Sequence, residues 1–550
     1  MIREKIEQAV ATTLASLGAG EVSFVVSRPG ELSHGDYATN AALAAGKALK
    51  KNPREVAEAL KEKLSIDGVE KVEVAGAGFI NFFLSQDAIA AEVTKASDAA
   101  YGNNVLYAGK KILVEYTDPN PFKEFHIGHL MSNAIGESIA RLLEHSGATV
   151  VRANYQGDVG PHVAKALFVL LERNIDTPNI RDISAAYVEG ARRYEESTDD
   201  KAAIDQLNKK IYEKTDERVN ALYEKGRSLT LEHFEELYKI LGTKFDFYFF
   251  ESESAPIGLS EVKAHPDVFV ESEGAIVFKG EGHGLHTRVF VNKLGLPTYE
   301  AKELGLMELK KKKLDFDESI TITANEQSEF FKVVYAAAKL ISPNLSHKLV
   351  HRSHGMMRFA EGKMSSRLGN VVTGESLIQT LKDAAQEKIE GRELKNAESV
   401  AQQVAVAAIK YTVLKQNTGK DIVFDPEKSL SLEGDSGPYL QYAHVRAGSL
   451  IKKAGDAVIE QVAEDAASSS LARLLVHYPD ALARAASELE PHHVTTYLTE
   501  LASTFNSWYA GERVIIDGKV AENKLQLIKA VKNILENGLS VLGIKAPQEM

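Results

Sequence analysis

The stretch that decides the fold reads Ile112-Leu113-Val114-Glu115-Tyr116 and then, past a short connection, His126-Ile127-Gly128-His129. The first run is apolar and predicts a strand, and a second strand-like run follows at residues 149–155. Between them, apolar residues recur at helical spacing over residues 130–143, and Gly147 marks the end of that pattern. The stretch therefore predicts a βαβ unit with two imidazoles at the N-terminus of its helix.

A helix N-terminus attracts phosphate, because its free N–H groups and the helix dipole both favour negative charge. Gly128 would let a flat purine lie against the backbone with no Cβ in the way. His126 and His129 could donate hydrogen bonds to phosphates as charge builds during displacement at the α-phosphorus. The pattern therefore predicts a nucleoside triphosphate site, although two histidines at this spacing could also be helix caps or surface residues.

A second candidate element is the basic, hydroxyl-rich segment Lys363-Met364-Ser365-Ser366-Arg367. Lys363 and Arg367 could clamp the β- and γ-phosphates, and Ser365 and Ser366 add further donors. Taken alone, the segment could equally be a basic surface turn. Its occurrence with the histidine pair, at opposite ends of one α/β segment, favours the nucleotide site.

The composition bounds the class of protein. A chain of 550 residues is too long for one core and predicts two to four domains, with 44% hydrophobic and 26% charged residues as in soluble proteins. The sequence contains no cysteine, which excludes disulfides, thiolate catalysis and cysteine-ligated metal sites. No run is long enough to cross a bilayer, and residues 1–7 are charged and unlike a signal peptide, so the cytoplasm is the expected compartment.

The net charge of −12 argues weakly against a nucleic-acid partner, because phosphate contacts depend on local basic patches. Candidate patches stand at residues 50–51, 310–313 and 452–453. Each of them taken alone is interpreted as a solvated helix face.

Three segments of different pattern predict a multidomain α/β fold. Residues 1–105 mix helices and strands in a small α+β domain. Residues 106–415 alternate strands and helices, which predicts a Rossmann-like, doubly wound, mostly parallel sheet with a helical insertion around residues 184–290. Residues 430–550 carry apolar stripes at helical spacing and predict an all-α bundle.

The two candidate elements resemble the HIGH and KMSKS signatures of the class I aminoacyl-tRNA synthetases. More narrowly, nearly the whole chain resembles the arginyl-tRNA synthetases. The stretches that carry this resemblance are residues 35–40, 78–82, 114–121, 154–162, 437–446 and 542–547. They imply an N-terminal domain that recognises the tRNA D-loop, a catalytic domain and a helical anticodon-binding domain.

This resemblance implies that the chain forms arginyl-adenylate and pyrophosphate from L-arginine and ATP, then esterifies the terminal ribose of tRNA(Arg). Mg²⁺ would arrive with ATP. The implied catalytic residues are His126, His129, Lys363, Lys123 and Arg367, with Gly128, Ser365 and Ser366 also holding ATP. Because Ser366 stands where the signature has a second lysine, the pattern leaves open whether Lys363, Lys123 or Arg367 carries the pyrophosphate charge.

The resemblance also implies an arginine site. Glu115 would supply a carboxylate for the guanidinium, and Asn120, with His126 close by, would hold the α-amino group. Tyr299 and Glu303 share a helix face at a spacing of four, and Glu303 stands where the family has aspartate, so the charge is kept and the reach changes. Gln327 is a further candidate for the pocket. Alternatively, Glu303 is an exposed helix acid that pairs with a lysine.

The tRNA contacts follow from the resemblance alone. Phe79 and Asn81 match positions that hold a D-loop base, although Phe79 could instead be core. The candidates for the anticodon, some of which must be structural, are Tyr439, Gln441, Tyr442, Arg446, Asn506, Tyr509 and Arg513. No protein-bound metal, DNA or membrane partner is expected, and the family default is a monomer.

Two other classes of function stay open. One is another class I synthetase or a small-substrate nucleotidyltransferase with the same fold. The other is a catalytically inactive paralogue that binds tRNA, against which the intact His126, Gly128, His129 and Lys363 argue.

Overall fold

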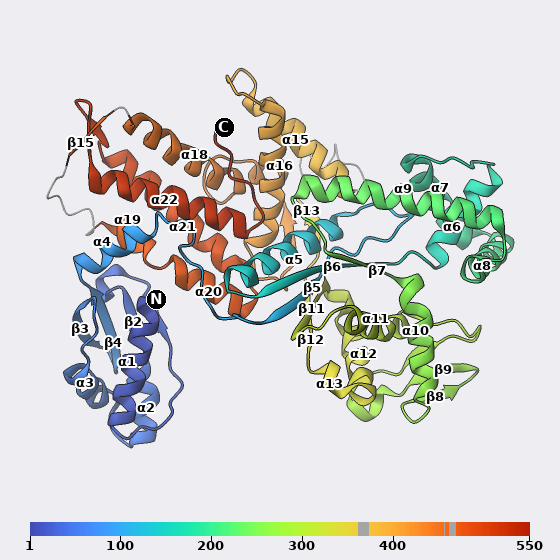
Figure 1. The fold of residues 1–550 in the computed structure, drawn as a ribbon, viewed down its shortest axis with the longest axis horizontal. Helices are drawn as coiled ribbons and strands as arrows, with labels where there is room; N and C mark the ends of the chain where they lie inside the picture. Colours follow the sequence, from blue (N-terminus) through green and yellow to red (C-terminus); the bar gives the residue numbers. More distant parts are fainter. Residues whose placement is uncertain (361–372, 456, 461–468) are drawn as a thin grey trace.

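The computed structural model describes residues 1–360, 373–455, 457–460 and 469–550. Figure 1 shows an elongated molecule in which a parallel sheet occupies the middle. The N-terminal unit lies beneath the C-terminal helices at one end, and a set of helices and a small sheet project at the other. None of the described helices is long and apolar enough to cross a membrane.

Five parallel strands form the central sheet in the order β12-β11-β5-β6-β7. They are β5 (Lys111–Glu115), β6 (Thr149–Gln156), β7 (Phe247–Phe250), β11 (Glu318–Ala324) and β12 (Leu349–His354). In the middle strand, β5, the apolar residues Ile112, Leu113 and Val114 are buried. Helix α5 (Ile127–His145) connects β5 to β6, and Gly147 takes the left-handed conformation just beyond it. The predicted βαβ unit and its glycine stop are confirmed.

The predicted helical insertion around residues 184–290 is only partly helical. Its helices, and the one before them, are α6 (Pro161–Glu172), α7 (Ile180–Glu196), α8 (Thr198–Glu213) and α9 (Glu217–Leu241). They pack around a core of their own. The chain then returns to the main sheet as β7, because its four aromatic residues pair with β6 at the sheet edge. Beyond it, β8 (Phe269–Ser272), β9 (Ala275–Phe278) and β10 (Arg288–Val291) form a separate antiparallel sheet.

Two glycines bring α10 (Glu251–Ala264) and α11 (Tyr299–Lys313) into close contact. A Cβ on Gly258 would collide with the carbonyl of Ala301, and a Cβ on Gly305 with the carbonyl of Ser254. This close approach fixes the position of α11 beside the sheet. Helices α12 (Ser328–Ile341) and α13 (Pro343–Ser346) follow between β11 and β12.

The N-terminal unit is an antiparallel sheet of order β1-β2-β4-β3 with four helices. Its strands are β1 (Val26–Ser27), β2 (Tyr37–Thr39), β3 (Val69–Ala75) and β4 (Phe79–Leu84). Its helices are α1 (Ile2–Ser16), α2 (Ala41–Leu49), α3 (Pro53–Lys63) and α4 (Gln86–Lys95). Ion pairs hold the unit against the bundle, for example Asp36 with Arg473 at 2.6 Å.

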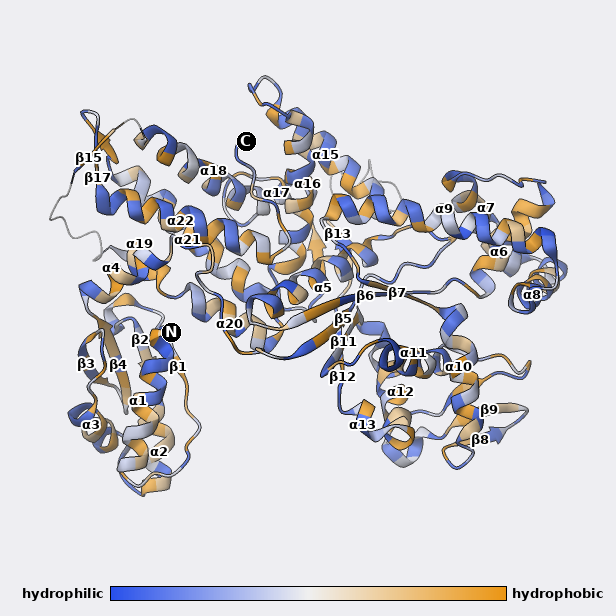
Figure 2. Ribbon diagram, in the orientation of Figure 1, coloured by the Kyte–Doolittle hydropathy of each residue, from blue (hydrophilic) through white to orange (hydrophobic). Residues whose placement is uncertain are grey.

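The described part of residues 430–550 is helical as predicted, except that residues 458–460, 515–516 and 519–521 form a small sheet, so the prediction of an all-α bundle is wrong there. The remaining chain as a whole, from Thr373 on, is largely helical. Its main helices are α15 (Gly374–Ile389), α16 (Ala397–Leu414), α18 (Gly437–Ala454), α19 (Ser470–Leu475), α20 (Tyr478–Glu488), α21 (His492–Gly511) and α22 (Glu522–Val541). Figure 2 shows that hydrophobic and hydrophilic residues alternate along these helices. The apolar stripe of α21, from Val494 to Phe505, is buried and belongs to the core.

Short elements complete the fold. They are α17 (Pro426–Ser429), the parallel pair β13 (Met357–Phe359) and β14 (Ile422–Phe424), and the sheet of β15 (Val458–Glu460), β16 (Ile515–Ile516) and β17 (Lys519–Ala521). Single 3-10 turns stand at η1 (Leu32–His34), η2 (Gly280–His283) and η3 (Asn325–Gln327).

Candidate active site

The two histidines at the start of α5 lock each other in place. The Nδ1 atom of His126 accepts a hydrogen bond from the N–H of Gly128, at 3.1 Å. The N–H of His126 in turn donates to Nδ1 of His129, also at 3.1 Å, and the two rings stack with centroids 3.6 Å apart. Because both Nδ1 atoms accept, each neutral ring carries its proton on Nε2. Both Nε2 atoms are therefore donors, as a phosphate site requires.

The electrostatic surroundings keep these rings neutral. Burial and the nearby ammonium of Lys123 lower the pKa of His126. The same effects, together with His126, hold the pKa of His129 well below its ordinary value. Lys123 is itself half-buried, its Nζ lies 5.5 Å from the ring of Tyr187, and burial lowers its pKa. Beside the two neutral rings, the positive charge that acts on them is thus that of Lys123.

The segment between β5 and α5 has an unusual backbone. Thr117, Asp118 and Phe122 have positive φ angles of 80°, 47° and 66°. Such strain persists only where neighbours hold it, and here the N–H of Thr117 donates to Oγ of Ser132 and the N–H of Tyr155 donates to Oδ1 of Asp118. This segment delivers Asn120 to the carboxyl edge of the sheet.

Asn120 meets the turn after β6. Its Oδ1 accepts a hydrogen bond from the N–H of Gly157 at 2.9 Å. A Cβ on Gly157 would lie 2.6 Å from that oxygen and 3.1 Å from Oε1 of Glu251, so only glycine fits. Glu251 is buried and forms an ion pair of 2.6 Å with Lys302, which is buried on α11. Glu251 and Lys302 are not predicted from the sequence, because no sequence motif marks either residue.

A buried acidic cluster lies between β5 and α11. Glu115 ends β5, and Glu303 faces the same region from α11; both side chains are buried. Burial raises the pKa of Glu303 to about 8, and burial and Glu115 raise the pKa of Asp118 well above its ordinary value. The alternative of an exposed Glu303 is therefore wrong. Tyr299, one turn earlier on α11, is 59% exposed and stands at the entrance.

The predicted basic patch at residues 310–313 requires a correction at its first member. Lys310 is buried, and its Nζ lies 2.9 Å from Oε2 of Glu115. The helix turns this residue towards β5, whereas the three lysines that follow it are exposed. No run of like charges in a sequence can show which member faces inward.

The KMSKS-like residues Lys363, Ser365, Ser366 and Arg367 lie outside the described residues. The chain resumes at Thr373, whose backbone forms an antiparallel bridge with His126. The N–H of Gly374 donates to the carbonyl of Phe125 at 2.6 Å. The segment that follows the predicted loop thus runs directly beside the histidine pair. Gln327 is exposed at the end of η3, just past the carboxyl end of β11.

A cavity of about 350 Å³, lined by several polar side chains, opens between α18 and α21. Its wall includes Arg446, whose guanidinium lies 4.8 Å from the ring of Tyr442 and 5.7 Å from that of Tyr509. Arg446 also donates to Oδ1 of Asn506 at 2.6 Å, and Nδ2 of Asn506 donates to the hydroxyl of Tyr439. The structure thus brings five of the predicted anticodon candidates together.

Other predicted tRNA contacts differ in exposure. Gln441 is fully buried, and its amide donates to the carbonyls of Gln403 and Lys545, so it is structural and its prediction as a tRNA contact is wrong. Arg513 is exposed beyond the end of α21. On β4 the ring of Phe79 is 46% exposed, which excludes a core role, whereas Asn81 is buried.

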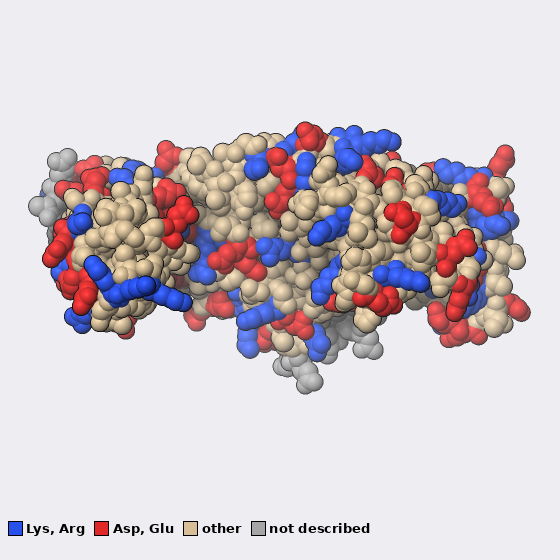
Figure 3. All heavy atoms as spheres, turned by 90° about the horizontal axis from the view of Figure 1, so that it is seen from below, with Lys and Arg blue, Asp and Glu red and all other residues tan. Residues whose placement is uncertain are grey.

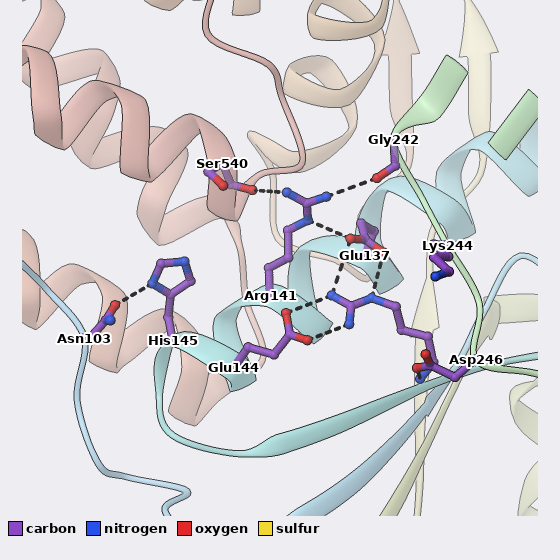
Figure 4. A pocket seen from close by; sticks show the side chains of 10 residues that line it. Asn103, Glu137, Arg141, Glu144, His145, Gly242, Lys244, Asp246 and Ser540 are labelled. Atoms are coloured by element: carbon purple, nitrogen blue, oxygen red, sulfur yellow. Dashed lines mark hydrogen bonds and ion pairs between the residues drawn. The ribbon is translucent and has the colours of Figure 1, made fainter. Parts of the chain in front are cut away.

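A second cavity, of about 540 Å³, lies at the opposite end of α5 from the histidines (Figure 4). Arg141 donates there to Glu137, to the carbonyl of Gly242 and to the carbonyl of Ser540. Arg152 also contacts Glu137. The cavity walls therefore pair their own charges and link α5 to the C-terminal helix α22. Within the described chain, no group of three or more histidines and carboxylates could hold a metal ion.

A histidine-capped helix at the carboxyl edge of a parallel sheet, together with a separate helical bundle, fits the class I aminoacyl-tRNA synthetases, and the comparison with known families shows that class. Residues 94–426 match the model of the class I tRNA synthetase (R) catalytic domain. Residues 440–550 match the DALR anticodon-binding domain, and residues 1–84 match the arginyl-tRNA synthetase N-terminal domain. The chain therefore belongs to the arginyl-tRNA synthetases, a family of ATP-dependent arginine–tRNA ligases.

Similar proteins agree over the full length. An arginine–tRNA ligase of Clostridium botulinum is 31% identical, and the alignment covers 100% of both chains. One of Lactobacillus delbrueckii is also 31% identical, with the same coverage. The solved arginyl-tRNA synthetase of Thermus thermophilus superposes with a TM-score of 0.82 at 26% identity, covering 100% of each chain.

Proposed function

We propose that this chain activates L-arginine with ATP and Mg²⁺ and then transfers arginine to the terminal ribose of tRNA(Arg). The observation that carries the proposal is the buried acidic cluster of Glu115 and Glu303 beside the neutral, Nε2-protonated histidine pair. Paired carboxylates suit a planar guanidinium, and imidazole donors suit a phosphate. Both features stand at the carboxyl edge of one parallel sheet, where α/β folds bind ligands.

The ATP half of the site is assigned to the start of α5. His126 and His129 would donate to the phosphates through Nε2, and Gly128 would leave room for the nucleotide. Lys123 would supply positive charge from the described side of the site, together with Lys363 and Arg367. The arginine carboxylate would attack the α-phosphorus, and pyrophosphate would leave.

The arginine half is assigned to β5, α11 and the strained segment before α5. Glu115 and Glu303 would bind the guanidinium, and Asn120 would meet the α-amino group. Tyr299 and Gln327 would line the entrance. The fixed position of Asn120 against Gly157 supports this assignment, because a pre-oriented amide loses little entropy on binding.

The tRNA half is assigned to two surfaces. The exposed ring of Phe79 would stack on a D-loop base, and the cavity around Arg446, Tyr442 and Tyr509 would receive an anticodon base between planar groups. On the face shown in Figure 3, basic and acidic side chains are interspersed. Recognition would therefore rest on local contacts rather than on one basic face. The resemblance to the arginyl-tRNA synthetases further supports a monomer in the cytoplasm.

ATP–pyrophosphate exchange with each amino acid, with and without tRNA, tests the function. We expect exchange with arginine alone, and only when tRNA(Arg) is present. Exchange with a different amino acid would contradict arginine specificity. A complete lack of exchange under every condition would instead favour a tRNA-binding protein without catalysis.

A further inference from the structure

A buried ammonium stands at the base of the assigned arginine pocket. Lys310 is 1% exposed, and its Nζ lies 2.9 Å from Oε2 of Glu115. Lysine is rarely buried to this extent unless it is paired, because an ammonium loses its hydration inside a protein. The contact with Glu115 therefore accounts for the burial of Lys310.

Helix α11 carries three residues of the assigned arginine pocket on one face. Tyr299, Glu303 and Lys310 are separated by four and seven residues, a spacing that keeps all three on one helix face. Their exposed fractions fall in the same order, from 59% to 6% to 1%. Among these three residues of α11, Lys310 is therefore the most buried, and Glu115 beside it is equally buried at 1% exposed.

The charges around Lys310 are unequal. Two buried acids, Glu115 and Glu303, and the half-buried Asp118 share the region, and Lys310 partly offsets the effect of burial by lowering the pKa of Asp118 and of Glu303. The other lysine buried on α11, Lys302, forms its ion pair with Glu251 at 2.6 Å. The counter-ion in contact with Glu115 is thus Lys310.

We propose that Lys310 is a positioning residue for arginine, which holds the carboxylate of Glu115 in the orientation that the guanidinium needs. A buried carboxylate that loses its charged partner is no longer fixed in place, and the free energy of holding it there rises. Lys310 acts through Glu115 and does not itself contact arginine. The proposal rests on the assignment of Glu115 and Glu303 to the guanidinium.

The test measures the KM values for arginine and for ATP separately, by pyrophosphate exchange in the presence of tRNA(Arg). We expect Lys310→Met to raise the KM for arginine about tenfold or more and to leave the KM for ATP within about twofold. Lys310→Arg should remain close to the parent, because it keeps the charge. The matched control is Lys312→Met, which changes an exposed lysine on the same helix. An unchanged arginine KM in Lys310→Met, equal changes in both KM values, or equal damage from Lys310→Arg would overturn the proposal.

A double-mutant cycle keeps the proposal testable if Lys310→Met fails to fold. On a Glu115→Gln background there is no carboxylate to hold, so adding Lys310→Met should change the KM for arginine by less than about twofold. A further large increase would contradict action through Glu115. The variant Glu303→Gln distinguishes a failure of the arginine-pocket assignment from a failure of the role proposed for Lys310. If that variant raises the KM for arginine while Lys310→Met does not, the pocket stands and the role of Lys310 fails. If Glu303→Gln has no effect, the pocket assignment itself fails.

Discussion

At the scale of the single residue, Glu303 is a buried acid whose pKa lies far from its ordinary value. Burial raises its pKa to about 8, and the nearby Glu115 adds to this effect, whereas Lys310 opposes it. At neutral pH the free protein therefore holds a substantial fraction of Glu303 as the neutral acid. A guanidinium stays charged throughout this range and binds the ionised form better.

The first prediction concerns the pH dependence of arginine binding. Because the carboxyl group must lose its proton, the KM for arginine should fall as pH rises from about 6.5 towards 8 and level off above that value. Pyrophosphate exchange over this range measures it, with the KM for ATP as the internal reference. In Glu303→Gln the slope should disappear, and the KM for arginine should exceed that of the parent most strongly at high pH. A parent profile that is already flat would contradict ionisation of Glu303 on binding.

Lys310 shows that a run of like charges in the sequence does not reveal which of its residues is buried. Four consecutive lysines predict a solvated helix end, and for three of them the structure agrees. The first is buried because the helix directs it at Glu115, which belongs to a strand almost two hundred residues earlier in the chain. The sequence contains both partners, but only the packing of α11 against β5 pairs them.

Among the elements, α5 has a different role at each end. Its first turn presents the histidine pair, and further along it Arg141 pairs with Glu137 and donates to the carbonyl of Ser540 in the C-terminal helix. The elements α18 and α21 are organised more simply, since their polar residues gather around one cavity.

The second prediction concerns that cavity. Replacing the guanidinium in Arg446→Gln removes the contacts with both tyrosine rings and should raise the KM for tRNA about tenfold, since stacking on a base is worth about 1–3 kcal/mol. Arginylation at varied tRNA concentration measures the effect, with saturating arginine. Arg484→Gln serves as the control, because Arg484 lies exposed on α20 and pairs with Glu488. Equal losses in the two variants would argue against a base site at Arg446.

For the molecule as a whole, the junction beside the larger cavity holds three parts of the chain together (Figure 4). Arg141 links Glu137 of α5 to a carbonyl after α9 and to a carbonyl near the end of α22. Close by, the buried side-chain nitrogen of Lys410 donates to the carbonyls of Leu241 and Gly543. Both side chains thus satisfy carbonyls at helix ends, where the charge of Arg141 also complements the helix dipole.

The third prediction tests this junction. Arg141→Met removes three hydrogen bonds and leaves the buried Glu137 with fewer partners, so unfolding should require about 1–3 kcal/mol less free energy. Denaturant unfolding followed by circular dichroism measures the change. Arg192→Met is the matched control, since its partner Glu196 is exposed and such pairs contribute about 0–1 kcal/mol. A loss in Arg141→Met no larger than in the control would show that the junction does not stabilise the fold.

Local sequence patterns were enough to predict much of the secondary structure of this molecule. The strand at β5, the capped helix after it and the glycine stop follow from apolar periodicity and capping, which act within a few residues. The insertion was harder to delimit, because an aromatic run such as residues 247–250 could belong to any sheet. Only its pairing with β6 places it in the main one.

The sequence by itself determined the parallel nucleotide fold, the position of His126 and His129 at a helix start, and the family, because these depend on local order along the chain. Tertiary structure alone decided which charges are buried and which partners they take. In the folded chain Lys310 pairs with Glu115, Asn120 is hydrogen-bonded to Gly157, and Gln441 is buried. The physical reason is that burial and ion pairing depend on distances between segments far apart in sequence, and those distances are set by how the helices and strands pack.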